Sequence, residues 1–109
     1  MLDDLLKLCK MFIADTEVKK DTTIGQICEP IWGQVDFLNA LLVLESMYLI
    51  DVPDELALRN DLTVEQFVVE IQPLPKVTDR LWIANRFKMY VDIAGNKSNP
   101  FRQGSEKLN

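Results

Sequence analysis

Few side chains in this chain have the chemistry of a catalytic group. The sequence contains no histidine, so a histidine-based catalytic triad and a zinc site with histidine ligands are both excluded. Cys9 and Cys28 lack the spacing of a metal site, and Glu29 beside the second thiol opposes formation of a reactive thiolate. Asp54 and Glu55 are adjacent in the sequence, so they do not share one face of a helix. The residue types therefore argue against an enzyme.

The composition is typical of a single soluble helical domain. Of the 109 residues, 48% are hydrophobic and 27% are charged, and a chain of this length has room for one hydrophobic core. No stretch approaches the roughly 18 apolar residues of a membrane-spanning helix, and the acidic start of the chain is not typical of a secretory signal. Two cysteines without a disulfide pattern favour a reducing compartment. We therefore expect a cytoplasmic protein that does not insert into a membrane.

The charge is divided unevenly along the chain. Residues 1–72 carry 14 acidic and 5 basic side chains, a net charge of −9, whereas residues 73–109 carry 3 acidic and 7 basic side chains, a net charge of +4. An acidic body repels the phosphates of nucleic acids and attracts a basic protein surface. We expect a protein partner with a basic surface and no nucleic-acid binding. The basic C-terminal part is itself such a surface, and it is a candidate to dock on its own chain or on a second copy.

Apolar periodicity predicts an all-α chain. Helices are expected over residues 2–14, 34–49 and 63–72, with a short helical turn at 53–58 and a fifth helix over 79–94. The segment between the first two helices is expected to be a long loop with apolar anchors at Ile24, Ile27 and Ile31, because Pro30 opposes a helix there. The expected elements form a small up-and-down bundle.

Local signals sharpen some of these elements. Thr63 and Gln66 have the spacing of a capping box at a helix start. Thr78 is expected to cap the fifth helix, and Gly95 is expected to end it. The helix over 34–49 is apolar around most of its circumference, apart from a narrow polar strip, so it is expected to be the central helix of the bundle.

The chain divides into three parts by pattern. The expected parts are a helical bundle over residues 1–75, an additional amphipathic helix packed on it over 76–95, and a flexible polar tail over 96–109. The apolar residues of the additional helix, among them Ile83, Phe87 and Val91, are expected to cover the bundle and complete its core.

An alternative role for the additional helix depends on its basic residues. Arg80, Arg86 and Lys88 give it positive charge. In this alternative the helix folds back on the acidic bundle and occupies the face that a partner would use, or it reaches across into a second copy.

Three motifs occur in the order and at the spacing of a known family. They are Gly33-Gln34-Val35-Asp36-Phe37-Leu38, then Asp51-Val52-Pro53-Asp54-Glu55, then Thr63-Val64. Residues 33–71 resemble an acyl carrier protein, read from its prosthetic-group site to its last helix. The resemblance implies an acyl-carrier-protein-like four-helix bundle, with three main helices and one short one, to which the fifth helix is an addition.

The resemblance fails at the residue that defines the family's activity. Gln34 stands where the family has the serine that carries the phosphopantetheine arm, and Gly33 stands where it has the preceding aspartate. A carboxamide has no nucleophilic oxygen that can form the phosphodiester. No 4'-phosphopantetheine cofactor, and no metal, is therefore expected.

The resemblance also implies a docking surface. In the family, the helix after the serine is an acidic surface for protein partners. Carried over by position, the partner-binding residues are Gln34, Asp36, Asn39, Leu42, Glu45, Ser46, Asp54 and Glu55. A simpler interpretation is that acids such as Asp36 and Glu45 only solvate the helix.

We therefore expect a non-catalytic protein-interaction module. One alternative is an acyl or peptidyl carrier protein of a fatty acid, polyketide or related pathway with an atypical attachment site. Another is a helical protein that binds an acyl chain without a covalent bond. The residues that would line such a space are Phe37, Leu41, Leu44, Phe67 and Ile71.

Overall fold

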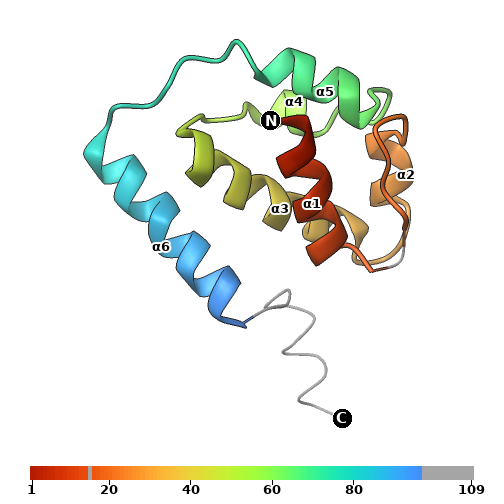
Figure 1. Cartoon of the computed structure of the whole chain (residues 1–109), viewed down its shortest axis with the longest axis horizontal. Coiled ribbons are helices and arrows are strands. Elements are labelled where there is room, and N and C mark those ends of the chain that lie inside the picture. The colour runs from red at the N-terminus through yellow and green to blue at the C-terminus, as the bar shows by residue number, and fades with distance from the viewer. Residues whose placement is uncertain (15, 97–109) are drawn as a thin grey trace.

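The computed structural model describes residues 1–14 and 16–96, and the side chains as far as Asp92. The described residues form six helices and no strand (Figure 1). The helices are α1 (Leu2–Phe12), α2 (Ile24–Cys28), α3 (Gly33–Tyr48), α4 (Asp54–Ala57), α5 (Val64–Ile71) and α6 (Arg80–Asn96). The prediction of an all-α chain is confirmed.

Helix α3 is the central element, as its apolar circumference predicts. It contacts α1, α2 and α6, while α1 also contacts α5. The rings of Phe37 from α3 and Phe67 from α5 meet edge to face, with centroids 5.8 Å apart, an arrangement that aromatic pairs favour. Both side chains are almost fully buried. The largest other fully buried side chains are Leu5, Cys9, Ile24, Ile27, Leu44, Val64 and Ile71.

Helix α2 lies in the segment that was expected to be a loop. Pro30 follows the end of this helix rather than preventing it. Ile24 and Ile27 are fully buried, as expected of apolar anchors, whereas Ile31 is 91% exposed and anchors nothing. The prediction of a loop was wrong because Pro30 lacks only its own amide N–H, and α2 ends at Cys28, before that amide is needed.

The starts of α2 and α5 are built in the same way. Thr63 and Gln66 form the predicted capping box, and Thr23 and Gln26 form a second one with the same spacing. An isolated antiparallel β-bridge pairs Thr23 with Thr63. The two helix starts therefore hold each other, although 40 positions separate them in the sequence.

The end of α3 turns the chain sharply. Leu49, which follows the helix, has a left-handed backbone (φ 55°, ψ 47°), a conformation that ends helices and is uncommon for a residue with a side chain. The hydroxyl of Tyr48 in the last turn donates a hydrogen bond to the carboxylate of Asp4 in α1. This contact ties the end of α3 to the start of α1.

Helix α6 begins and ends one or two residues later than predicted. Asp79, not Thr78, caps it, because its carboxylate accepts hydrogen bonds from the amides of Leu81 (2.9 Å) and Trp82 (3.3 Å). The helix continues through Gly95 to Asn96. The rest of the predicted tail, residues 97–109, lies outside the described residues.

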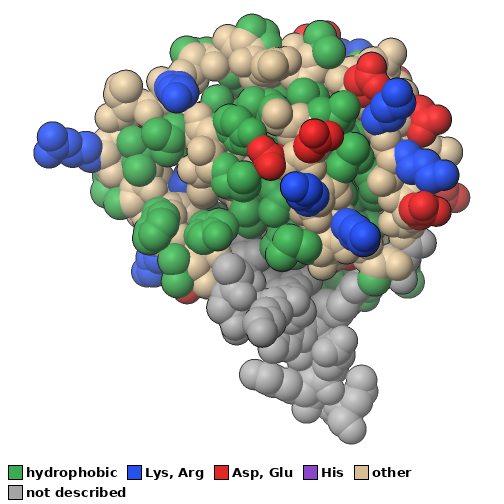
Figure 2. Space-filling view, viewed as in Figure 1, with side chains coloured by type: hydrophobic (Ala, Val, Ile, Leu, Met, Phe, Trp, Pro, Cys, Tyr) green, Lys and Arg blue, Asp and Glu red, His purple; other side chains and the backbone are tan. Residues whose placement is uncertain are grey.

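The side chains of α6 pack less completely than predicted. Ile83 and Tyr90 are half-buried, but Phe87 is 63% exposed and Val91 is 49% exposed. The prediction that the last two complete the core was wrong, because α6 rests on α3 along one side only. Figure 2 shows the consequence, since hydrophobic side chains gather on the visible face over α6.

Candidate functional site

The start of α3 corresponds to the predicted prosthetic-group position. A Cβ atom on Gly33 would lie 1.9 Å from the carbonyl oxygen of Ile27 at the end of α2, so a residue with a side chain does not fit without a backbone shift. The amide of Gly33 donates to the carbonyl oxygen of Pro30 (2.9 Å). Glycine at position 33 is therefore required by the close approach of α2.

Gln34, the next residue, has an exposed side chain. The side-chain carboxamide of Gln34 is accessible at the start of α3 but has no nucleophilic oxygen that could carry a prosthetic group. Ser46 is the only serine in residues 16–96, and it lies about three turns further along α3. Its Oγ is 3.1 Å from the carbonyl oxygens of both Leu42 and Arg86. Ser46 is thus held between α3 and α6 and does not replace the missing serine.

A charge cluster lies where α6 packs against the end of α3. We call this contact the seam, and its residues are Glu45, Ser46, Asp51, Trp82 and Arg86. The Nη2 atom of Arg86 in α6 lies 3.8 Å from Oε2 of Glu45 and 3.7 Å from Oδ1 of Asp51. Glu45 Oε2 also accepts a hydrogen bond from the amide of Val52 (2.9 Å). The guanidinium carbon of Arg86 lies 5.0 Å from the ring centroid of Trp82, in a cation–π arrangement. One cation is thereby held by two carboxylates and an aromatic ring.

Burial decides the electrostatics of this seam. Glu45 is only 5% exposed, and this burial raises the pKa of its carboxyl above the ordinary value of 4.5. The Val52 amide and the Arg86 guanidinium oppose the rise in pKa, because both stabilise the charged form. The Nε atom of Arg86 is buried and has no hydrogen-bond partner among the residues that the structure describes. The hydrogen-bonding capacity of the buried polar groups in the seam is therefore only partly used.

The predicted docking residues do not form one exposed strip. Gln34, Asp54 and Glu55 are exposed, Leu42 and Ser46 are half-buried, and Asp36, Asn39 and Glu45 are buried. The expectation of a solvated acidic face along α3 was wrong, because neighbouring elements enclose α3 on this side as well. The structure brings together Leu42, Glu45 and Asp54 at one end of α3, and leaves Gln34 at the other.

Two charged residues of the seam were absent from the predicted site. Asp51 follows α3 and was seen only as part of the turn motif. Arg86 was predicted only as one of the basic residues of the additional helix. Opposite charge was the available signal, but residues so far apart in sequence are paired only by the fold.

Hollows flank the seam on both sides of Arg86. One of about 280 Å³ lies between α3, α4 and the loop that joins them. Its lining residues include Leu38, Leu42, Glu45, Asp51, Val52 and Arg86. A second hollow of about 350 Å³, between α3 and the first turns of α6, is lined mainly by apolar atoms.

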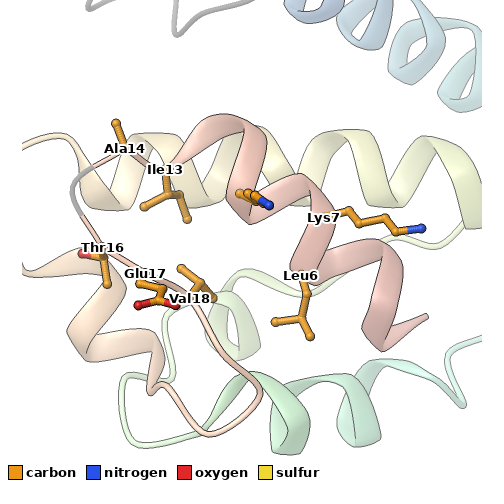
Figure 3. A pocket seen from close by; sticks show the side chains of 8 residues that line it. Leu6, Lys7, Ile13, Ala14, Thr16, Glu17 and Val18 are labelled. Atoms are coloured by element: carbon orange, nitrogen blue, oxygen red, sulfur yellow. The ribbon is translucent and has the colours of Figure 1, made fainter.

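A larger hollow lies away from the predicted site. It has a volume of about 520 Å³ and is formed by α1 and the segment that follows it. Figure 3 shows Leu6 from α1, with Ile13 and Val18 from the following segment, around this hollow. None of the predicted docking residues lines it.

Other chemistry receives little support from the described residues. Within residues 1–14 and 16–96, no group of three or more Cys, Asp or Glu side chains has the arrangement of a metal site. Burial raises the pKa of the Cys9 thiol to about 12 and also raises the pKa of Cys28, so neither is an activated thiolate. No helix in the described part of the chain is long and apolar enough to cross a membrane.

No family model, no curated protein and no solved structure matches this chain.

Proposed function

We propose that this chain is a non-catalytic protein-interaction module. It has an acyl-carrier-protein-like bundle, lacks the phosphopantetheine arm, and binds a basic helix at the end of α3. The observation that carries the proposal is the position of Arg86 between Glu45 and Asp51. This end of the molecule already holds one helix through a cation.

The chemistry of the surface suits such a ligand. Asp54 and Glu55 are exposed next to the seam, and they extend its negative charge beyond the region that α6 covers. The hollow of about 280 Å³ beside Arg86 is lined by apolar side chains as well as acids. An amphipathic helix offers both an apolar face and cationic side chains. A partner of that type would use the hollow and the exposed acids together.

Helix α6 acts in this proposal as a tethered competitor. A segment linked to the same chain has a high effective concentration at its site. A partner therefore either displaces α6 or binds to the acids that α6 leaves exposed. Asp54 and Glu55 belong to the second group, and so they provide the first contact.

The two alternatives receive less support. A carrier function needs a nucleophile at the start of α3, and the exposed side chain there is Gln34. An acyl-chain site needs a space among the expected lining residues. Phe37, Leu44, Phe67 and Ile71 are all at most 1% exposed and line none of the hollows described above, so they act as packed core. Leu41, which is 3% exposed, is the one expected lining residue that borders a hollow, the one of about 280 Å³.

The lack of the arm is tested by intact mass. The purified chain is incubated with coenzyme A and a broad-specificity phosphopantetheinyl transferase, beside an authentic carrier protein as the positive control. We expect the control to gain one phosphopantetheine and this chain to keep its mass. A gain of one phosphopantetheine would refute this part of the proposal, and peptide mapping would identify the residue.

The interaction surface is tested by charge reversal. Asp54→Lys with Glu55→Lys reverses the exposed acids beside the seam. Glu65→Lys with Glu70→Lys makes the same change in charge on α5, where both residues are also exposed. We expect the first pair to lose proteins that the wild-type chain and the second pair retain in quantitative co-purification. Identical sets of bound proteins for all three chains would refute the proposed surface.

A further inference from the structure

The connection between α5 and α6 makes few contacts with the bundle. Residues 73–79 contain two prolines and run as an extended segment around the outside of the molecule (Figure 1). Pro73, Pro75 and Lys76 are exposed. The amide of Val77 donates to the carbonyl oxygen of Leu49. Seven extended residues span up to about 23 Å, which is enough to carry α6 to a neighbouring molecule.

The docking of α6 is concentrated in one seam. Its main packing partner among the described helices is α3, and none of its described hydrophobic side chains belongs to the buried core. The polar contacts of Arg86 with Glu45, Asp51 and Ser46 join α6 to the rest of the bundle. In the chain, only the 73–79 segment connects these two parts. The same contacts form equally well if α6 comes from another chain.

We propose that α6 is exchanged between two copies of this chain, which gives a reciprocal, domain-swapped dimer. Each α6 then lies on the α3 seam of the other copy, with Arg86 between the partner copy's two carboxylates. Charge suits α6 of a second copy as well as it suits the chain's own α6, because residues 73–109 carry a net +4 and residues 1–72 a net −9. Exchange of an identical element through a hinge requires no new binding site.

Apolar side chains at the edge of the seam remain exposed although α6 is docked. Met47 of α3 is 50% exposed, and Phe87 of α6, which borders the same hollow, is 63% exposed. Met47 and Phe87 line a hollow of about 190 Å³ together with Ser46 and Tyr90. Because little apolar surface is removed from water at this edge of the seam, α6 is easily released from its own chain.

The inference uses the same seam as the proposed function but is tested separately, because oligomeric state is measured with no other protein present.

The first test removes Pro75 and Lys76, which shortens the connection by about 7 Å and leaves Leu74 and Val77, its half-buried residues, in place. The shortened connection would then have to stretch for α6 to reach the seam of its own chain. In sedimentation velocity we expect this variant to have twice the 12.5 kDa mass of the chain. The wild-type dimer fraction is expected to rise with concentration.

The second test pairs two charge variants and leaves the buried Glu45 unchanged. In the first variant, Asp51→Arg weakens the attraction between the acidic side of the seam and the chain's own Arg86. In the second variant, Arg86→Glu weakens the attraction between α6 and the chain's own Glu45 and Asp51. When the two are refolded together, the swapped heterodimer regains one native seam, with Arg86 of the first chain on the second chain's acids. We expect it to exceed either homodimer by about tenfold in native mass spectrometry, since a restored pair of roughly 1.4 kcal/mol gives that ratio.

The controls are the two variants refolded alone, and the wild-type chain refolded in labelled and unlabelled form. Wild-type homodimers are expected to mix in statistical proportion. Monomers at every concentration for the wild-type chain and the shortened variant would overturn the exchange. Mixing of the charge variants in statistical proportion would overturn it as well, because a dimer held by another surface does not depend on matched seams.

Discussion

Helices α5 and α6 both carry an apolar stripe in sequence, yet they differ in how they are held. Val64, Phe67 and Ile71 of α5 are fully buried against the centre of the bundle. In α6, Phe87 is mostly exposed, and the polar contacts to α3 are made by Arg86. The stripe is thus necessary for burial but not sufficient, because a neighbour must also cover it. The bundle is stabilised by its core, and α6 by a seam.

The largest difference in the free energy of unfolding should appear when one aromatic ring is removed from α5 and, separately, one from α6. We expect Phe67→Ala to lower the free energy of unfolding by about 3–5 kcal/mol, since it leaves a cavity beside Phe37. Phe87→Ala should change it by about 0.5 kcal/mol or less, as at other exposed positions. Urea unfolding of both variants measures the difference. Equal losses would mean that α6 belongs to the core.

A smaller effect should separate two glycines within the bundle. Gly33→Ala places a Cβ atom against the backbone of Ile27, and the forced shift of α2 or α3 should cost about 3 kcal/mol. Gly25→Ala is the matched control, because its Cβ atom would lie 3.1 Å from the Asn60 carbonyl oxygen, and a small shift accommodates it. We expect this control to cost less than about 1 kcal/mol. Thermal unfolding that ranks the two in the opposite order would contradict the close approach of α2 and α3.

The smallest effect should be a pH dependence that arises at the seam. Because burial raises the pKa of Glu45 in the folded chain, the folded state binds more protons than the unfolded state at pH values between 4.5 and the raised pKa. This group therefore makes the chain more stable as the pH falls through that window, and adds no further stability below it. Glu45→Gln keeps an acceptor for the Val52 amide but removes the titration.

Urea unfolding at neutral pH and near pH 5 measures this difference. We expect the wild-type chain to gain more stability on acidification than the Glu45→Gln variant. Asp51→Asn is the control, since Asp51 is exposed and its loss leaves the buried carboxyl in place. A wild-type pH profile that Glu45→Gln leaves unchanged would show that Glu45 is solvated in solution.

The sequence predicted the elements better than it predicted their environments. Thr63 and Gln66 gave the start of α5 correctly, because a capping box is local chemistry. Thr23 and Gln26 have the same spacing and mark the start of α2, a local signal that the prediction of a loop did not include. These signals act over a few residues, so they are readable from one sequence.

The candidate site was predicted less well because it is made by distant contacts. Asp36, Asn39 and Ser46 form a mainly polar strip on a helical wheel, but a wheel does not show which neighbouring elements cover that strip, and Asp36 and Asn39 are in fact buried. Likewise, Asp51 and Arg86 are 35 positions apart, and only the placement of α6 pairs them. The likeness to carrier proteins stays a prediction, carried by its three motifs.

The stacking of Arg86 over Trp82 has an optical consequence. The chain contains two tryptophans, Trp82 on α6 and Trp32 at the start of α3. One indole is therefore in the seam and the other at the junction of α2 and α3. When Trp32 is replaced by phenylalanine, the remaining fluorescence reports release of α6, and when Trp82 is replaced, it reports opening of the bundle. Two emission signals then distinguish a loosened seam from a melted core in the same chain.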